Sequence, residues 1–60
     1  MAVITALEAV LRVREVAHRL DCDEDTVYSL IRQGQIRAIR VGRLLRVPES
    51  ALADFIAGQG

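Results

Sequence analysis

The spacing of the apolar residues changes at Gly34, and this change limits the folds that the chain can adopt. Before Gly34, apolar side chains recur every three or four residues, as at Val27 and Leu30, which predicts amphipathic helices. After it they alternate with polar residues, as at Ile39 and Val41, which predicts short strands. Sixty residues make one small domain. The helices and the strands must therefore share a single core.

Two helices separated by a short turn are predicted upstream of Gly34. The stretch VREVAHRL, which starts at Val13, has its apolar residues at helical spacing. A second helix is expected to begin after Asp23, which is a good N-cap and is followed by acids that suit the first turn. Gly34 is suited to the position just past its C-terminal end. About three residues separate the helices, which is the spacing of a helix-turn-helix.

A hairpin and a third helix are predicted downstream. Gly42 and Arg43 suit a two-residue loop of type II′. Pro48 is expected to open the last helix, where its missing N–H costs least. The predicted fold class is mainly α with a small β-hairpin: a winged helix-turn-helix in the order helix-turn-helix-hairpin-helix.

The domain is expected to cover residues 11–57, with residues 58–60 as a frayed tail. The N-terminal extension, residues 1–10, has three interpretations. Thr5 to Glu8 fits the spacing of a capping box, so a short helix over Ala6–Val10 is one of them. A strand through Ala2–Thr5 and disorder are the others.

The charges are strongly segregated along a chain whose net charge is zero. All eight basic residues are arginines, and five of them lie between Arg32 and Arg46, where there is no Asp or Glu. Arg43 is predicted at the tip of the hairpin, with Arg40 and Arg46 beside it on the solvent face. A charge run is often only a solvated surface, but on a hairpin that follows a helix-turn-helix it favours contact with DNA phosphates.

Other chemistries find little support. One cysteine, Cys22, and one histidine, His18, are too few ligands for a zinc site. There is no nucleophile–base pair and no Gly-rich phosphate loop, so we expect neither an enzyme nor a cofactor. The apolar start MAVITALEAVL contains Glu8 and lacks a basic segment, so we expect neither a signal peptide nor a membrane span. A reducing cytoplasm is the expected compartment.

From about Leu11 to Ala57 the chain resembles the excisionase-type DNA-binding domains, small winged-helix relatives of the MerR regulators. The matching stretches are VREVAHRL, DTVYSLIRQGQI and AIRVGRLLRVPESALADFI. The resemblance implies a non-catalytic protein that binds duplex DNA in a bacterial host cell or nucleoid. As a recombination directionality factor of a bacteriophage or an integrated element, it would bend DNA and direct an integrase, a tyrosine or serine recombinase, toward excision. Several copies binding cooperatively would compensate for few phosphate contacts per copy.

The same resemblance places the second helix in the major groove and the hairpin along the backbone or in the minor groove. For Tyr28, packing on the helix surface is an equally good interpretation. The residues expected to contact DNA are Thr26, Tyr28, Ser29 and Arg32 from the helix and Arg40, Arg43 and Arg46 from the hairpin.

The acidic start of the second helix departs from the family, and two other functions stay open. Members usually carry Ser and often a base where this chain has Asp23, Glu24 and Asp25, and these acids would repel phosphates. The same fold would also suit a small MerR-like transcriptional regulator, or a protein-interaction module that does not bind DNA. Leu44, on the outward side of the hairpin, is either an ordinary exposed leucine or part of a self-association patch with the AVI segment near the start.

Overall fold

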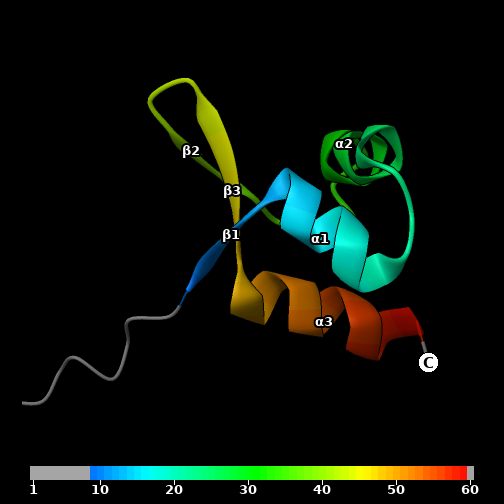
Figure 1. Cartoon of the computed structure of the whole chain (residues 1–60). Coiled ribbons are helices and arrows are strands. Elements are labelled where there is room, and N and C mark those ends of the chain that lie inside the picture. Colours follow the sequence, from blue (N-terminus) through cyan, green and yellow to red (C-terminus); the bar gives the residue numbers. More distant parts are fainter. Residues whose placement is uncertain (1–8, 60) are drawn as a thin grey trace, which may run out of the picture.

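A computed structural model describes residues 9–59 (Figure 1). It confirms the predicted fold class, because three helices and a small antiparallel sheet form a winged helix-turn-helix. In chain order the elements are β1 (Val10–Arg12), α1 (Val13–Leu20), α2 (Glu24–Arg32), β2 (Ile39–Val41), β3 (Leu44–Pro48) and α3 (Glu49–Gln59). Within the described part of the chain, no helix is long and apolar enough to cross a lipid bilayer.

The core draws side chains from every described element except β2. Val16, Val27 and Val47 are completely buried, one each from α1, α2 and β3. Burying an aliphatic side chain of this kind contributes about 1.5–3 kcal/mol. The hairpin therefore projects from the core at β2, as a wing does. The complete set of buried apolar residues is Leu11, Val13, Val16, Ala17, Val27, Ile36, Val47, Ala51 and Leu52.

The turn of the helix-turn-helix is set by the C-terminal end of α1. Asp21 has a left-handed backbone conformation, with φ 57° and ψ 48°, which aspartate tolerates better than most residues. Its N–H donates to the carbonyl of His18, and the N–H of Cys22 donates to that of Ala17. This is the hydrogen-bond pattern of a Schellman motif. The turn leaves Cys22 half-buried against the core.

The sheet has one more strand than the sequence predicted. Its order is β1-β3-β2, and β1 pairs with β3 so that Leu11 lies opposite Val47. Val10 therefore begins a strand and is not in a helix. The rest of the helix considered over residues 6–10, and the strand considered over residues 2–5, lie outside the described residues.

Pro48 does not open α3, which corrects a prediction. It is the last residue of β3 and pairs with Val10, so the pairing with β1 keeps it extended. Proline has no N–H to donate, and at the end of a strand this interrupts no hydrogen bond within the sheet. The helix begins one residue later, at Glu49, whose N–H donates to the carbonyl of Ala9 over 3.1 Å.

The last helix also runs past the predicted end of the domain. α3 continues through Gln59, whereas the sequence predicted a frayed tail from Gly58. Gly58 is not among the residues with positive φ, so it continues the helical conformation and does not terminate it.

The two-residue loop of the hairpin is as predicted. β2 ends at Val41, β3 begins at Leu44, and these two residues are paired. Gly42 has φ +63°, whereas Arg43 is not among the residues with positive φ. Positive φ at the first loop position alone matches a type II′ turn.

Candidate nucleic-acid interface

The acidic start of α2 is partly explained by capping. One oxygen of Asp23, Oδ1, accepts from the backbone N–H of Thr26 at 2.9 Å and from its hydroxyl at 2.7 Å. The hydrogen bonds from Thr26, first the side-chain one and then the backbone one, lower the pKa of Asp23. Asp23 is therefore an N-cap, as predicted. The hydroxyl of Thr26, a predicted DNA contact, is already engaged in this cap.

The exposed face of α2 brings together two of the predicted site residues. Helical spacing aligns Asp25, Ser29 and Arg32 on the side opposite the buried Val27. Arg32 Nη2 donates to Ser29 Oγ over 3.2 Å, so the serine orients the guanidinium. Tyr28 is 39% exposed, on the flank of this line.

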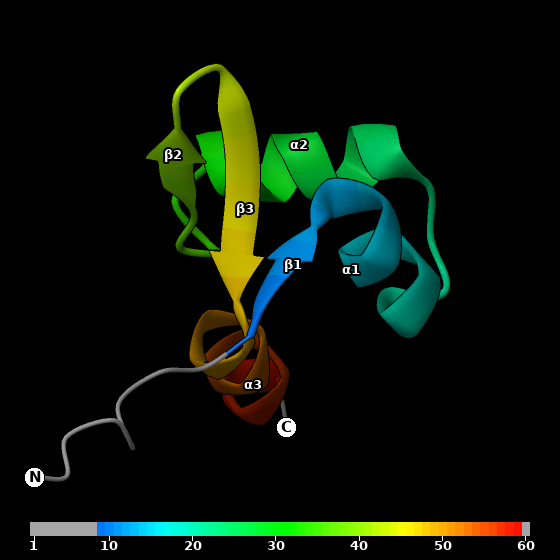
Figure 2. The ribbon, with the colours of Figure 1, turned by 60° about the vertical axis from the view of Figure 1, so that its left-hand side comes forward.

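α2 has a basic end and an acidic end. In Figure 2 the helix runs from the α1–α2 turn, on the right, toward the side of the hairpin. Arg32, in its last turn, is therefore at the hairpin side, whereas Glu24 and Asp25 occupy the first turn at the far side. This arrangement makes the C-terminal end of α2 and the hairpin the part of the motif best suited to an anion.

Arg40 and Arg46 do not share a face of the hairpin, which corrects the prediction that both lie on its solvent side. The two-residue loop pairs Val41 with Leu44, so Arg40 lies opposite Leu45 and Arg46 lies opposite Ile39. Directly paired residues point to the same side of a sheet, and successive residues alternate. Arg40 is therefore on the side of Leu45, and Arg46 is on the other side.

The three hairpin arginines also differ in what they contact. Arg46 is half-buried, and its Nη1 donates to the carbonyl of Leu45 over 2.8 Å. Arg40 and Arg43 are exposed. In residues 9–59 neither of these two has an ion pair or a side-chain hydrogen bond. Their guanidinium groups are available to a ligand, whereas that of Arg46 is partly committed.

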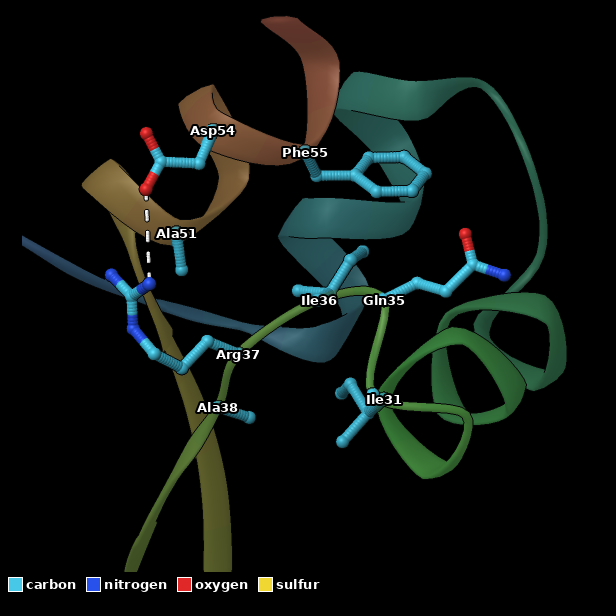
Figure 3. Close-up of a pocket in the computed structure, with 9 residues that line it drawn as sticks. Ile31, Gln35, Ile36, Arg37, Ala38, Ala51, Asp54 and Phe55 are labelled. Atoms are coloured by element: carbon cyan, nitrogen blue, oxygen red, sulfur yellow. Dashed lines mark ion pairs between the residues drawn. The ribbon is translucent and has the colours of Figure 1, made fainter. Parts of the chain in front are cut away.

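Arg37, the remaining arginine of the run, is held by α3. Its Nη1 lies 3.7 Å from Asp54 Oδ2, and its Nη2 donates to Ser50 Oγ over 3.5 Å. The ion pair lies at the edge of a groove of about 550 Å³. Figure 3 shows it beside Phe55 and Ile31, two of the apolar residues that line the groove. Arg37 is therefore directed toward α3 and not toward the hairpin tip.

The sequence analysis did not name Arg12 among the candidate interface residues. The structure places it in β1, directly opposite Arg46 of β3. The only local signal for this strand was the apolar pair Val10 and Leu11 beside it.

Comparison with known proteins gives consistent results. A family model described as a helix-turn-helix domain matches residues 10–60. An excisionase of Streptomyces ambofaciens is 38% identical over 55 residues, which cover 92% of this chain and 89% of that protein. A probable excisionase of Saccharopolyspora erythraea is 38% identical over 47 residues, 78% of this chain and 48% of that protein. A putative DNA-binding protein of Mycobacterium tuberculosis is 41% identical over 46 residues, 77% of this chain and 59% of that protein.

The chain thus spans about half the length of the last two relatives. No solved structure matches it.

Proposed function

The chain belongs to the excisionase-type helix-turn-helix family, and on this premise we propose that it binds duplex DNA without catalysing a reaction. The observation that carries the proposal is the set of three exposed arginines, Arg32, Arg40 and Arg43, none of which has an acidic partner within residues 9–59. They lie at the hairpin end of α2 and on the hairpin itself. Guanidinium groups form strong, charge-assisted hydrogen bonds to phosphate oxygens.

In this proposal the C-terminal half of α2 enters the major groove. Ser29 and Arg32 face the bases there, and the hydrogen bond between them limits the positions that the guanidinium can take on that side of the helix. Arginine reads guanine through two parallel hydrogen bonds. Asp25, on the same face of the helix, approaches the phosphates of the DNA backbone and reduces the affinity for DNA.

The hairpin contributes the contacts that do not depend on sequence. Arg43 at the tip and Arg40 on β2 neutralise phosphates along the backbone or in the adjacent minor groove. Arg46, also a predicted contact, has less freedom to do so because it donates to Leu45. Binding by one copy is modest, since few phosphates are neutralised and the chain has no net charge to attract DNA at long range.

We further propose an excisionase-like role, for which the names of two relatives are the support. Several copies bind adjacent sites cooperatively, bend the DNA, and so direct an integrase, a tyrosine or serine recombinase, toward excision. Cooperation would raise the occupancy that one weakly bound copy lacks. The bending and the integrase follow from the family resemblance.

The first experiment is a fluorescence-anisotropy titration against random duplex DNA at several salt concentrations. We expect saturable binding whose log affinity falls linearly with log salt, with a slope of about 2 if Arg40 and Arg43 each neutralise one phosphate. No binding at low salt, from a protein shown by circular dichroism to be folded, would contradict the proposal and favour a protein-interaction module.

A second experiment tests the architectural role. A duplex selected from a random library is labelled at both ends, and the end-to-end distance is followed by fluorescence energy transfer as protein is added. We expect a steep, cooperative decrease in distance. Binding without a change in distance would instead support a transcriptional regulator with the same fold.

A further inference from the structure

A second groove lies between β1 and α1, and within the described residues its lining is entirely ionisable. Its volume is about 390 Å³, and its four lining residues are all exposed: Arg12, Arg14, Glu15 and His18. We call it the β1–α1 groove. The centres of protein–protein interfaces and the pockets that bind drug-sized molecules are mostly apolar. This lining therefore suits a charged, hydrated ligand better than either of those.

The β1–α1 groove carries a positive charge that its own carboxylate does not offset. Within residues 9–59, Arg12 and Arg14 have neither an ion pair nor a side-chain hydrogen bond. Glu15 is already paired, because its Oε2 lies 3.3 Å from Nη2 of Arg19. An oxyanion in the groove would accept charge-assisted hydrogen bonds from both free guanidinium groups. An imidazole N–H of His18 is a further donor.

Arg46 adds to the positive charge beside the groove. Arg12 and Arg46 are directly opposed on β1 and β3, and like charges in that position are destabilising. Arg46 donates to the carbonyl of Leu45, but this hydrogen bond does not neutralise its charge. An anion bound at Arg12 would relieve the repulsion between the two arginines.

The β1–α1 groove and the DNA-binding face of α2 point in different directions. α1 and α2 contribute Val16 and Val27 to one core, and the exposed face of α2 is opposite Val27. Helical spacing places Glu15 and His18 on the side of α1 opposite its own buried side. Figure 2 shows β3 and the first turn of α1 in front of α2. Because DNA is stiff over one or two turns, a short duplex along α2 does not reach the groove.

We propose that the β1–α1 groove binds a backbone phosphate of a second DNA duplex, so that one copy bridges two segments of DNA. Arg12 and Arg14 hold the phosphate, and Arg46 attracts it from the neighbouring strand. Bridging brings together sites that are far apart along the DNA, which bending at one site does not. The proposal deepens the DNA binding proposed above and rests on it, since α2 and the hairpin hold the first duplex.

The test counts the duplexes bound by one copy of the whole chain. A duplex of about 12 base pairs, a little over one helical turn, is added in excess at low salt, and analytical ultracentrifugation measures the mass of the complex. Excess DNA keeps two copies from sharing one duplex. We expect two binding steps: a complex of one duplex per copy, and then, at higher DNA concentration, a complex of two.

Two substitutions in the groove should change the second step in opposite directions. Arg14→Ala should weaken it by about tenfold at low salt, because a phosphate contact is lost, and should leave the first step as in the parent. Glu15→Gln should strengthen it by about threefold, because it removes the groove's carboxylate. Arg37→Ala is the matched control for Arg14→Ala: it removes the same charge from a side chain directed toward α3 and should leave the second step unchanged.

A variant without the first site separates this proposal from the proposed function. Arg40→Glu with Arg43→Glu should abolish the first step and leave weak binding of one duplex at the groove. Adding Arg14→Ala to that variant should remove the remaining binding. Circular dichroism confirms that each variant is folded.

Three results would overturn the proposal. One is a complex that never exceeds one duplex per copy although the first step is present, which would leave the proposed function intact. Another is an equal weakening of the second step by Arg14→Ala and Arg37→Ala. The third is a glutamate-only peptide that shifts the NMR signals of His18 when a second duplex does not, which would assign the groove to an acidic protein.

Discussion

Asp54 of α3 pairs with Arg37 over 3.7 Å and so separates this arginine from the others of its run. Five arginines lie between Arg32 and Arg46, but the structure divides them by what each one contacts. Arg37 is held by α3, Arg46 donates to its own strand, and Arg32 donates to Ser29. Only Arg40 and Arg43 have neither an ion pair nor a side-chain hydrogen bond within residues 9–59. This division makes the contribution of each arginine to DNA binding separately testable.

Arg43→Ala should weaken binding to every duplex alike and lower the salt slope by about one unit, because one phosphate contact is lost. The measurement is the anisotropy titration described above. Arg37→Ala is the matched control, since it removes the same charge from a side chain directed toward α3, and it should leave the slope nearly unchanged. Parent-like binding by Arg43→Ala would exclude the hairpin from the interface.

Asp25→Arg should raise the affinity for short random duplexes by about tenfold at low salt, because it replaces a charge that repels phosphates with one that attracts them. A short duplex holds one copy, so the change reports on DNA contact and not on contact between copies. Asp25→Asn should give a smaller increase. Weaker binding by both variants would mean that Asp25 makes a favourable contact with a base.

Asp23→Ala should lower the melting temperature on the order of 5 °C, because it removes the acceptor for the N–H and hydroxyl of Thr26. Thermal unfolding by circular dichroism measures this. Asp25→Ala removes an acid from the same turn that has no such bonds, and should change the melting temperature much less. Equal losses in the two variants would contradict the capping role.

The same cap predicts a pH dependence. The hydrogen bonds from Thr26 lower the pKa of folded Asp23 below its ordinary value of 3.8. The stabilisation is therefore complete above that unfolded value and is lost as the pH falls through the lower, folded pKa. The melting temperatures of the parent and Asp23→Ala should converge once the pH falls below the lowered pKa of folded Asp23. A difference that persists there would assign the effect to something other than the carboxylate.

Gly42→Ala should destabilise the fold by about 1–2 kcal/mol, measured by chemical denaturation. The cost comes from the backbone, because Gly42 has φ +63° and an added Cβ would meet no atom within 4 Å. Gly58→Ala is the control: an added Cβ there is equally unobstructed, but φ is not positive. It should stabilise α3 by about 0.5–1 kcal/mol. A neutral Gly42→Ala would mean that the loop adopts another turn type.

Local sequence patterns predicted the elements whose stabilising contacts are local. The helix over VREVAHRL is α1, and the alternation around Gly42 and Arg43 gives the two strands of the hairpin. The strand β1 depends on pairing with β3, far along the chain, and three residues carry too little periodicity to reveal it. Pro48 was misplaced for the same reason, since its extended conformation is imposed by Val10.

The candidate site shows the same difference between local contacts, which the sequence predicts, and contacts between distant segments, which it does not. Ser29 and Arg32 were predicted on one exposed helix face, and the hydrogen bond between them needs only helical spacing. The separation of Arg40 from Arg46 follows from the register of the hairpin, and it could have been worked out from the two-residue loop. The pairing of Arg37 with Asp54 could not, because it depends on where α3 packs.

The reactivity of Cys22 reports on the packing of the helix-turn-helix. It is the chain's single thiol, and the α1–α2 turn leaves it half-buried against the core. The packing of α1 and α2 covers part of the thiol, so a thiol reagent should modify Cys22 faster when the two helices separate. If DNA binding holds α1 and α2 together, the rate of Cys22 modification should fall when DNA is added. Labelling of this one native residue would then measure how much DNA binding stabilises the motif.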